Sequence, residues 1–136
     1  MVKVKIVYEG ELRCRLTHET SGTTISTDAP KDNMGKGESF SPTDLVGSAL
    51  GSCMLTTMAI VAKRRGIEFG TASVEVIKEM ISEPERRIGK ITVTFQMPKG
   101  LSPEHRALFE RAAMTCPVHK SLNPSVEISV KFNYSD

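Results

Sequence analysis

The sequence predicts an α+β domain in which mostly antiparallel sheets wrap around a long buried central helix. Stretches that alternate apolar and polar residues, typical of half-buried strands, come in runs and do not alternate singly with helices. In addition, no charged residue occurs between Asp44 and Lys63, so this segment is predicted to be a helix that is apolar on nearly all sides. The 136 residues suffice for one domain, residues 1–136, with its own core.

Three short strands are predicted before the helix. Residues 2–6 alternate apolar and basic side chains, and Glu9-Gly10 is a plausible turn. Leu12, Cys14 and Leu16 then alternate with polar residues, and residues 23–27 form a third strand. Cys14 shares a face with two leucines, so we expect it to be a small buried hydrophobe. The polar loop 28–40 that follows is long for a compact domain, and such loops are often functional.

Both ends of the central helix are marked in the sequence. Ser41 suits the N-cap, with Asp44 completing a capping box, and Gly66 suits the left-handed position after the last turn. Gly47 and Gly51, among other small residues, allow other backbone to approach closely. The segment is too short and too rich in Gly, Ser and Thr to favour a membrane span. Because a small domain cannot easily cover such a helix, we expect a second chain to do so in an intertwined homodimer.

Strands at 73–81 and 88–97 are predicted after the helix, joined by a polar connection. A second helix begins at Pro103, with Ser102 as its cap, and runs to about residue 114. Its apolar stripe comprises Leu108, Phe109, Ala112 and Ala113. A short helical turn at 117–122 and a last strand at 126–132 complete the order.

Composition narrows the function. The 18 basic and 16 acidic residues are too balanced to favour nucleic acid or an anionic membrane as partner. With two Tyr, five Phe and no Trp, the chain has little material for stacking on bases. No secretory signal pattern precedes the first strand, so we expect a cytoplasmic protein. In a reducing cytoplasm, cysteines are more often catalytic or metal-binding than structural.

Two of the three cysteines lie in settings that invite chemistry. Cys53 is about three turns into the central helix, beyond the reach of the helix dipole, so a thiolate there would need a cation from elsewhere. Cys116 would cap the short helix that begins at Pro117, which favours a thiolate, and His119 could assist it. Local electrostatics alone therefore ranks Cys116 as the better nucleophile. A buried cysteine in a helix is nevertheless more often part of a core.

Cofactor chemistry finds little support. Cys116 and His119 have the spacing of half a metal site, but His18 and His105 each stand alone. The sequence also lacks a phosphate-binding or dinucleotide-binding glycine loop. We expect no metal and no other cofactor.

The run Ser-Pro-Thr-Asp-Leu-Val-Gly-Ser-Ala-Leu-Gly-Ser-Cys53 resembles the central helix of the OsmC/Ohr family, the osmotically inducible and organic hydroperoxide resistance proteins. Cys116 is similar to the family's second cysteine in spacing and setting. The resemblance implies an intertwined α+β homodimer that reduces organic hydroperoxides, or hydrogen peroxide, without metal, flavin or haem. It also implies that Cys53 is the peroxidatic cysteine, that Cys116 resolves it to a disulfide, and that an external dithiol restores both.

The activating residues do not follow the family pattern. Thr43 stands where the best-studied members have a glutamate, and their N-terminal arginine has no certain counterpart here. The candidates for stabilising the Cys53 thiolate are Arg13, Arg15, Lys31, Lys36, Glu38 and Asp44.

Two other functions compete with the peroxidase. One is a non-enzymatic module that binds a small ligand in an apolar pocket of the same dimer. The other is a general thiol–disulfide oxidoreductase, against which the lack of a Cys-x-x-Cys motif argues.

Overall fold

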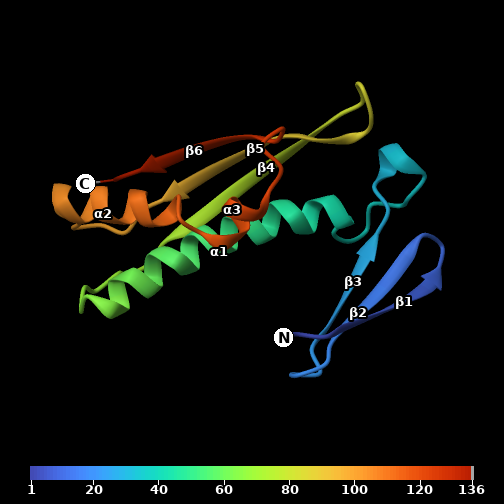
Figure 1. Cartoon of the computed structure of the whole chain (residues 1–136), viewed down its shortest axis with the longest axis horizontal. Coiled ribbons are helices and arrows are strands. Elements are labelled where there is room, and N and C mark those ends of the chain that lie inside the picture. The colour runs from blue at the N-terminus through green and yellow to red at the C-terminus, as the bar shows by residue number, and fades with distance from the viewer. Residues whose placement is uncertain (136) are drawn as a thin grey trace. The chain divides into compact units, whose positions relative to one another are not determined.

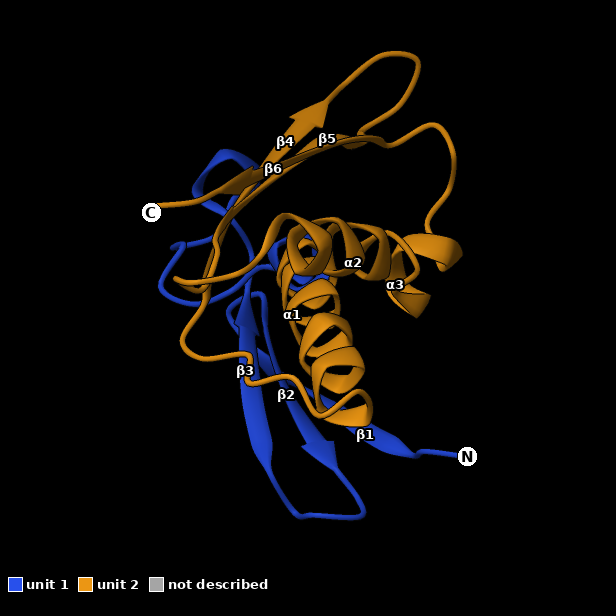
Figure 2. Ribbon diagram, turned by 90° about the vertical axis from the view of Figure 1, so that its left-hand side faces the viewer, with its two compact units in different colours: residues 1–46 blue, residues 47–136 orange. Residues whose placement is uncertain are grey.

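The computed structural model describes residues 1–135 and contains two compact units, residues 1–46 and the residues from Gly47 on. Figure 2 colours them separately, and each is described here by itself. Figure 1 labels the strands and helices in chain order. The α+β class is as predicted, with two three-stranded sheets and one long helix.

The first unit is an antiparallel sheet of β1 (Val4–Gly10), β2 (Arg13–His18) and β3 (Thr24–Asp28), in that order. Ile6 pairs with Leu16, and Leu16 with Ile25, so the apolar residues of the alternating pattern share one face. The loop after β3 contains a single 3₁₀ turn, η1 (Lys31–Asn33).

The first turn of the chain differs from the sequence prediction. The turn lies at Glu11 and Leu12, both with positive φ (53° and 64°), and β1 runs on to Gly10. The Leu12 N–H donates to the Tyr8 hydroxyl at 3.2 Å, which supports this bend. Leu12 is therefore a turn residue and does not belong to the strand, because the backbone here adopts a conformation that side-chain alternation does not reveal.

The central helix is α1 (Pro42–Arg64), and the predicted capping box is confirmed at its start. The Asp44 N–H donates to the Ser41 hydroxyl at 3.1 Å, while the Ser41 N–H donates to the Asp44 carboxylate at 2.9 Å. At the other end Gly66 has φ 66°, as its predicted role requires.

The second unit contains the sheet β4 (Ser73–Ile81), β5 (Arg87–Gln96) and β6 (Glu127–Asn133). β4 and β5 are antiparallel, whereas β6 is parallel to β5. The parallel pairing requires a crossover, which α2 (Pro103–Ala113) and α3 (Pro117–Ser121) supply (Figure 1).

Glycines let α1 approach β4 closely. A Cβ atom added at Gly51 would lie 2.6 Å from Val76 Cγ2, and one at Gly47 would lie 3.3 Å from Val76 Cγ1. The buried face of α1 joins β5 and α2 in one core, whose members are Leu50, Met54, Met58, Ala62, Ile91, Val93, Phe95, Met97, Leu101, Phe109, Ala112, Ala113 and Cys116. The predicted apolar positions of β5 and α2 thus belong to the core or pack against it.

The opposite face of α1 is open. Ser52, Thr56 and Ile60 are exposed along it, so the helix is buried on one side only within this chain. By length and composition alone α1 could cross a membrane, since its most apolar stretch has a mean hydropathy of 1.8. The sequence-based view that it is too short is therefore wrong. Core helices of soluble proteins meet the same criterion, and the buried face of α1 fits that role.

Candidate active site

Cys53 lies on α1 between the buried and open faces of the helix. Its side chain is half-buried and packs against the core, next to the fully buried Met54. The backbone carbonyl of Cys53 accepts a hydrogen bond from the Thr57 hydroxyl at 2.7 Å. The thiol is thus held on a rigid element at the edge of the core.

Cys116 occupies the predicted N-cap of α3. Its backbone is extended (φ −60°, ψ 139°), and its Sγ accepts a hydrogen bond from the His119 N–H at 3.2 Å. Its own N–H donates to the Ala113 carbonyl at 3.3 Å. Unlike Cys53, the residue is wholly buried, with none of its surface exposed.

The structure brings these two thiols together. The two side chains lie close enough for Cys53 to act on the pKa of the Cys116 thiol, and both cysteines are free. Residues that are far apart in sequence, one on α1 and one at the start of α3, therefore form a dithiol site within the second unit. Sequence spacing gave no means to establish this contact.

Burial opposes the thiolate that was expected for Cys116. Desolvation raises the pKa of the Cys116 thiol, and the hydrogen bond and charge interaction with Cys53 raise it further. The His119 N–H acts in the opposite direction but is outweighed. The expectation that the N-cap position favours a thiolate at Cys116 is thus wrong, because a buried thiolate loses more hydration than one cap hydrogen bond restores.

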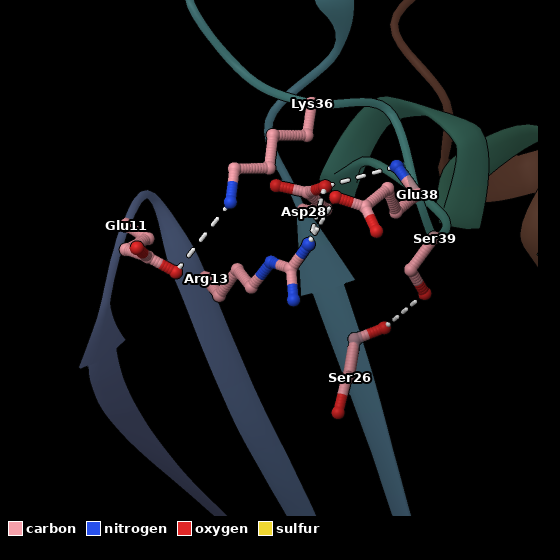
Figure 3. Close-up of polar contacts among 7 residues, drawn as sticks. All are labelled: Glu11, Arg13, Ser26, Asp28, Lys36, Glu38 and Ser39. Carbon is pink, nitrogen blue, oxygen red and sulfur yellow. Dashed lines mark hydrogen bonds and ion pairs between the residues drawn. The ribbon is translucent and has the colours of Figure 1, made fainter.

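A second polar cluster lies in the first unit, shown in Figure 3. The Arg13 guanidinium is 2.9 Å from the Glu38 carboxylate and 3.5 Å from that of Asp28. Asp28 is buried, with 1% of its surface exposed, and its Oδ2 also accepts the Glu38 N–H at 2.9 Å. This backbone hydrogen bond is the main cause that lowers the pKa of Asp28, with Arg13 adding to it against the cost of burial.

Asp28 is the residue of this cluster that sequence analysis missed. It stands at the end of β3 and fixes the following loop through Glu38, while Lys36 forms an exposed ion pair with Glu11 at 3.8 Å (Figure 3). The sequence feature that could have indicated Asp28 is its place as an acidic residue where an alternating strand meets a polar loop.

The remaining candidates have separate places. Arg15 pairs with Glu9 at 3.8 Å on the exposed part of β2, and Lys31 is exposed in η1. Asp44 completes the capping box of α1.

Metal ligands do not gather among residues 1–135: no group of three or more His, Cys, Asp or Glu side chains is suitably placed there. His18 Nδ1 instead lies 2.7 Å from the Ser21 hydroxyl.

Fold and site together define a class of protein: an α+β protein with two adjacent thiols, one on a long central helix and one at a helix N-cap. The comparison with protein families agrees. The OsmC-like protein family matches residues 35–131, and the chain belongs to this family.

Solved structures with the same fold are numerous. A protein of Psychrobacter arcticus 273-4, named for an inferred role in osmotic stress induction and detoxification, is 39% identical with a TM-score of 0.91, over 98% of this chain and 96% of that one. The organic hydroperoxide resistance protein OhrB of Bacillus subtilis is 20% identical with a TM-score of 0.73, over 98% of each chain. The OsmC-like protein of Mycoplasma pneumoniae is 17% identical with a TM-score of 0.83, over 100% and 98%. No curated protein gives a significant match.

Proposed function

We propose that this protein is a cytoplasmic thiol peroxidase that reduces organic hydroperoxides, with Cys53 as the attacking and Cys116 as the resolving cysteine. The observation that carries the proposal is the contact between the two thiols combined with the raised pKa of Cys116. The buried partner keeps its proton and donates it toward Cys53, so Cys53 is the sulfur left to act as nucleophile. Membership of a family that includes organic hydroperoxide resistance proteins supports the same assignment.

The reaction balances with these two residues and one external reductant. The Cys53 thiolate attacks the distal peroxide oxygen, the O–O bond breaks, and the alkoxide leaves as the alcohol after taking up a proton. Cys53 becomes a sulfenic acid. The Cys116 sulfur then attacks the Cys53 sulfur, the S–O bond breaks, and water and a disulfide result. A dithiol reduces the disulfide by exchange.

We also propose that the active form is the intertwined homodimer. The apolar face of the first unit is open, since Val4, Ile6, Tyr8 and Ile25 are 47 to 63% exposed. A three-stranded sheet with such a face needs a partner surface. The open face of α1, where Ile60 is 44% exposed, also needs a partner surface to cover it.

A ligand-binding role is the alternative, and one observation favours it. A pocket of about 360 Å³ lies between α1 and α2, lined by Val61, Arg64, Arg65, Leu108, Arg111, Ala112 and Thr115. Its apolar wall and three guanidinium groups suit a small organic anion. Binding that saturates and survives loss of either thiol would support this alternative.

Steady-state turnover separates the two functions. Cumene hydroperoxide consumption with excess dithiothreitol is measured for the wild type, Cys53→Ser and Cys116→Ser. The peroxidase proposal predicts that Cys53→Ser abolishes turnover. Equal turnover by the wild type and Cys53→Ser would contradict it, and a lack of turnover in all three would shift the weight to ligand binding.

A further inference from the structure

The resolving step sets a problem for Cys116. Its thiol must lose a proton before its sulfur can attack Cys53, yet the residue has no exposed surface through which water could take that proton. The main groups that act on its titration are Cys53, from α1, and the N–H groups of Val118 and His119, from α3. None of these is a charged side chain that could hold a thiolate in the interior, so a proton acceptor is needed nearby.

His119 is placed to be that acceptor. It is the third residue of α3, a position from which a side chain can reach back toward the N-cap residue, here Cys116. The backbone N–H of His119 donates a hydrogen bond to Cys116 Sγ at 3.2 Å, which fixes the position of one residue relative to the other. The N–H of Cys116 is occupied by the Ala113 carbonyl, so the imidazole is not needed as a backbone cap.

The two ring nitrogens of His119 lie in different surroundings. Nδ1 is buried and has no hydrogen-bond partner among residues 1–135, which is uncommon for a buried polar atom. Nε2 is not among the buried unpartnered atoms of the described residues, and no protein group bonds to it there; because the residue is only half-buried, this side of the ring faces solvent. An imidazole with one nitrogen inside and one outside can take up a proton inside and release one to water.

We infer that His119 is the general base of the resolving step, accepting the Cys116 proton at Nδ1. This inference rests on the peroxidase proposal above. In the reduced protein the Cys116 thiol lies beside Cys53, and Nδ1 has no hydrogen-bond partner among residues 1–135. Once Cys53 is a sulfenic acid it is no longer a thiolate acceptor, and the proton goes to Nδ1 as the S–S bond forms. The S–O bond breaks at the same time, and the leaving hydroxide takes up a proton to become water.

The test measures the two steps separately. Reduced wild type, His119→Gln and His119→Asn are mixed with one equivalent of cumene hydroperoxide. Dimedone trapping followed by mass spectrometry reports Cys53 sulfenic acid, and loss of both thiols reports disulfide closure. His105→Gln is the matched control, because His105 lies in the first turn of α2, where its N–H donates to the Ser102 hydroxyl. Normal formation of sulfenic acid also shows that each variant is folded.

We expect sulfenic acid to form at the same rate in all four proteins. Disulfide closure at pH 7 should be about 100-fold slower in both His119 variants, and unchanged in His105→Gln. The variants' closure rates should depend more steeply on pH than the wild-type rate, because hydroxide must then replace the imidazole.

Closure that is equally fast and has the same pH profile in wild type and the His119 variants would overturn the inference but leave the peroxidase standing. If the wild type loses no thiols and the His119 variants form no Cys53 sulfenic acid, the proposed function itself is removed instead.

Discussion

Two opposing effects act on the sulfur of Cys116. The helix cap supplies an N–H that favours the thiolate, but complete burial removes the hydration that a charge needs. Burial and the interaction with Cys53 outweigh the cap, so the pKa of the Cys116 thiol is raised. At the residue scale the sequence was enough to single out the two cysteines and to place Cys116 at the N-cap of a short helix. It was not enough to rank them, because desolvation depends on elements that are distant in sequence.

Cys116→Ser should stop the cycle after its first step. A serine hydroxyl can keep the cap but cannot form a disulfide, so Cys53 sulfenic acid should accumulate after one equivalent of peroxide and react with dimedone. The peroxide-treated wild type should contain little of it. Mass spectrometry measures both, and equal dimedone labelling of the two proteins would count against Cys116 as the resolving residue.

Asp28 predicts an acid-dependent stability. Because its pKa is lowered in the folded chain, it contributes stability above the ordinary carboxylate range of about pH 4, and this is lost as the pH falls through the lower folded value. Urea unfolding between pH 2 and 6 should therefore show a smaller pH dependence in Asp28→Asn than in the wild type. Glu85→Gln, an exposed residue of the β4–β5 connection, should behave like the wild type.

At the scale of elements, the packing of α1 against β4 depends on the absence of side chains. Gly51→Ala adds a methyl group 2.6 Å from Val76 Cγ2, on a β-branched side chain that has little freedom to move. Overpacking of about 1–3 kcal/mol should exceed the gain in helix propensity of about 1 kcal/mol. Chemical denaturation should therefore show a net loss of about 1 kcal/mol, and Ser52→Ala on the exposed face a change within about 0.5 kcal/mol. A more stable Gly51→Ala would contradict this packing.

The cap of α2 offers a second element-scale test. The Ser102 hydroxyl accepts the His105 N–H at 3.1 Å, and Pro103 begins the helix. Ser102→Ala should lower the free energy of unfolding by about 1 kcal/mol, whereas Ser102→Asp should retain most of it. Equal unfolding midpoints for all three proteins would show that the cap carries no stability.

Element boundaries were predictable wherever the sequence marks them with caps. The start of α1, its glycine end and the start of α2 all match the prediction. The exception is the turn at Glu11 and Leu12, where two non-glycine residues adopt left-handed φ directly after Gly10. The proximity of Cys53 and Cys116 was implied by the family resemblance alone; residue patterns could not predict it, because it depends on the crossover that α2 and α3 make between β5 and β6.

At the scale of the whole molecule, the exposed apolar faces predict association. Ile6 is 62% exposed, so on a monomer Ile6→Glu should have little effect. In the proposed homodimer it places a charge in the interface and should produce monomers in light scattering coupled to size exclusion. Lys5→Gln, on the opposite sheet face, removes only an exposed ion pair with Glu19 at 3.4 Å and should remain dimeric. A monomeric wild type would refute the dimer.

The central claim is that one peroxide molecule is reduced by the Cys53–Cys116 pair. The most direct measurement counts free thiols in the reduced wild type, Cys53→Ser and Cys116→Ser after one equivalent of cumene hydroperoxide. The proposed mechanism predicts a fast loss of two thiols in the wild type, and no fast loss in Cys53→Ser. A fast loss that persists in Cys53→Ser but stops in Cys116→Ser would show that the roles are reversed and contradict the account.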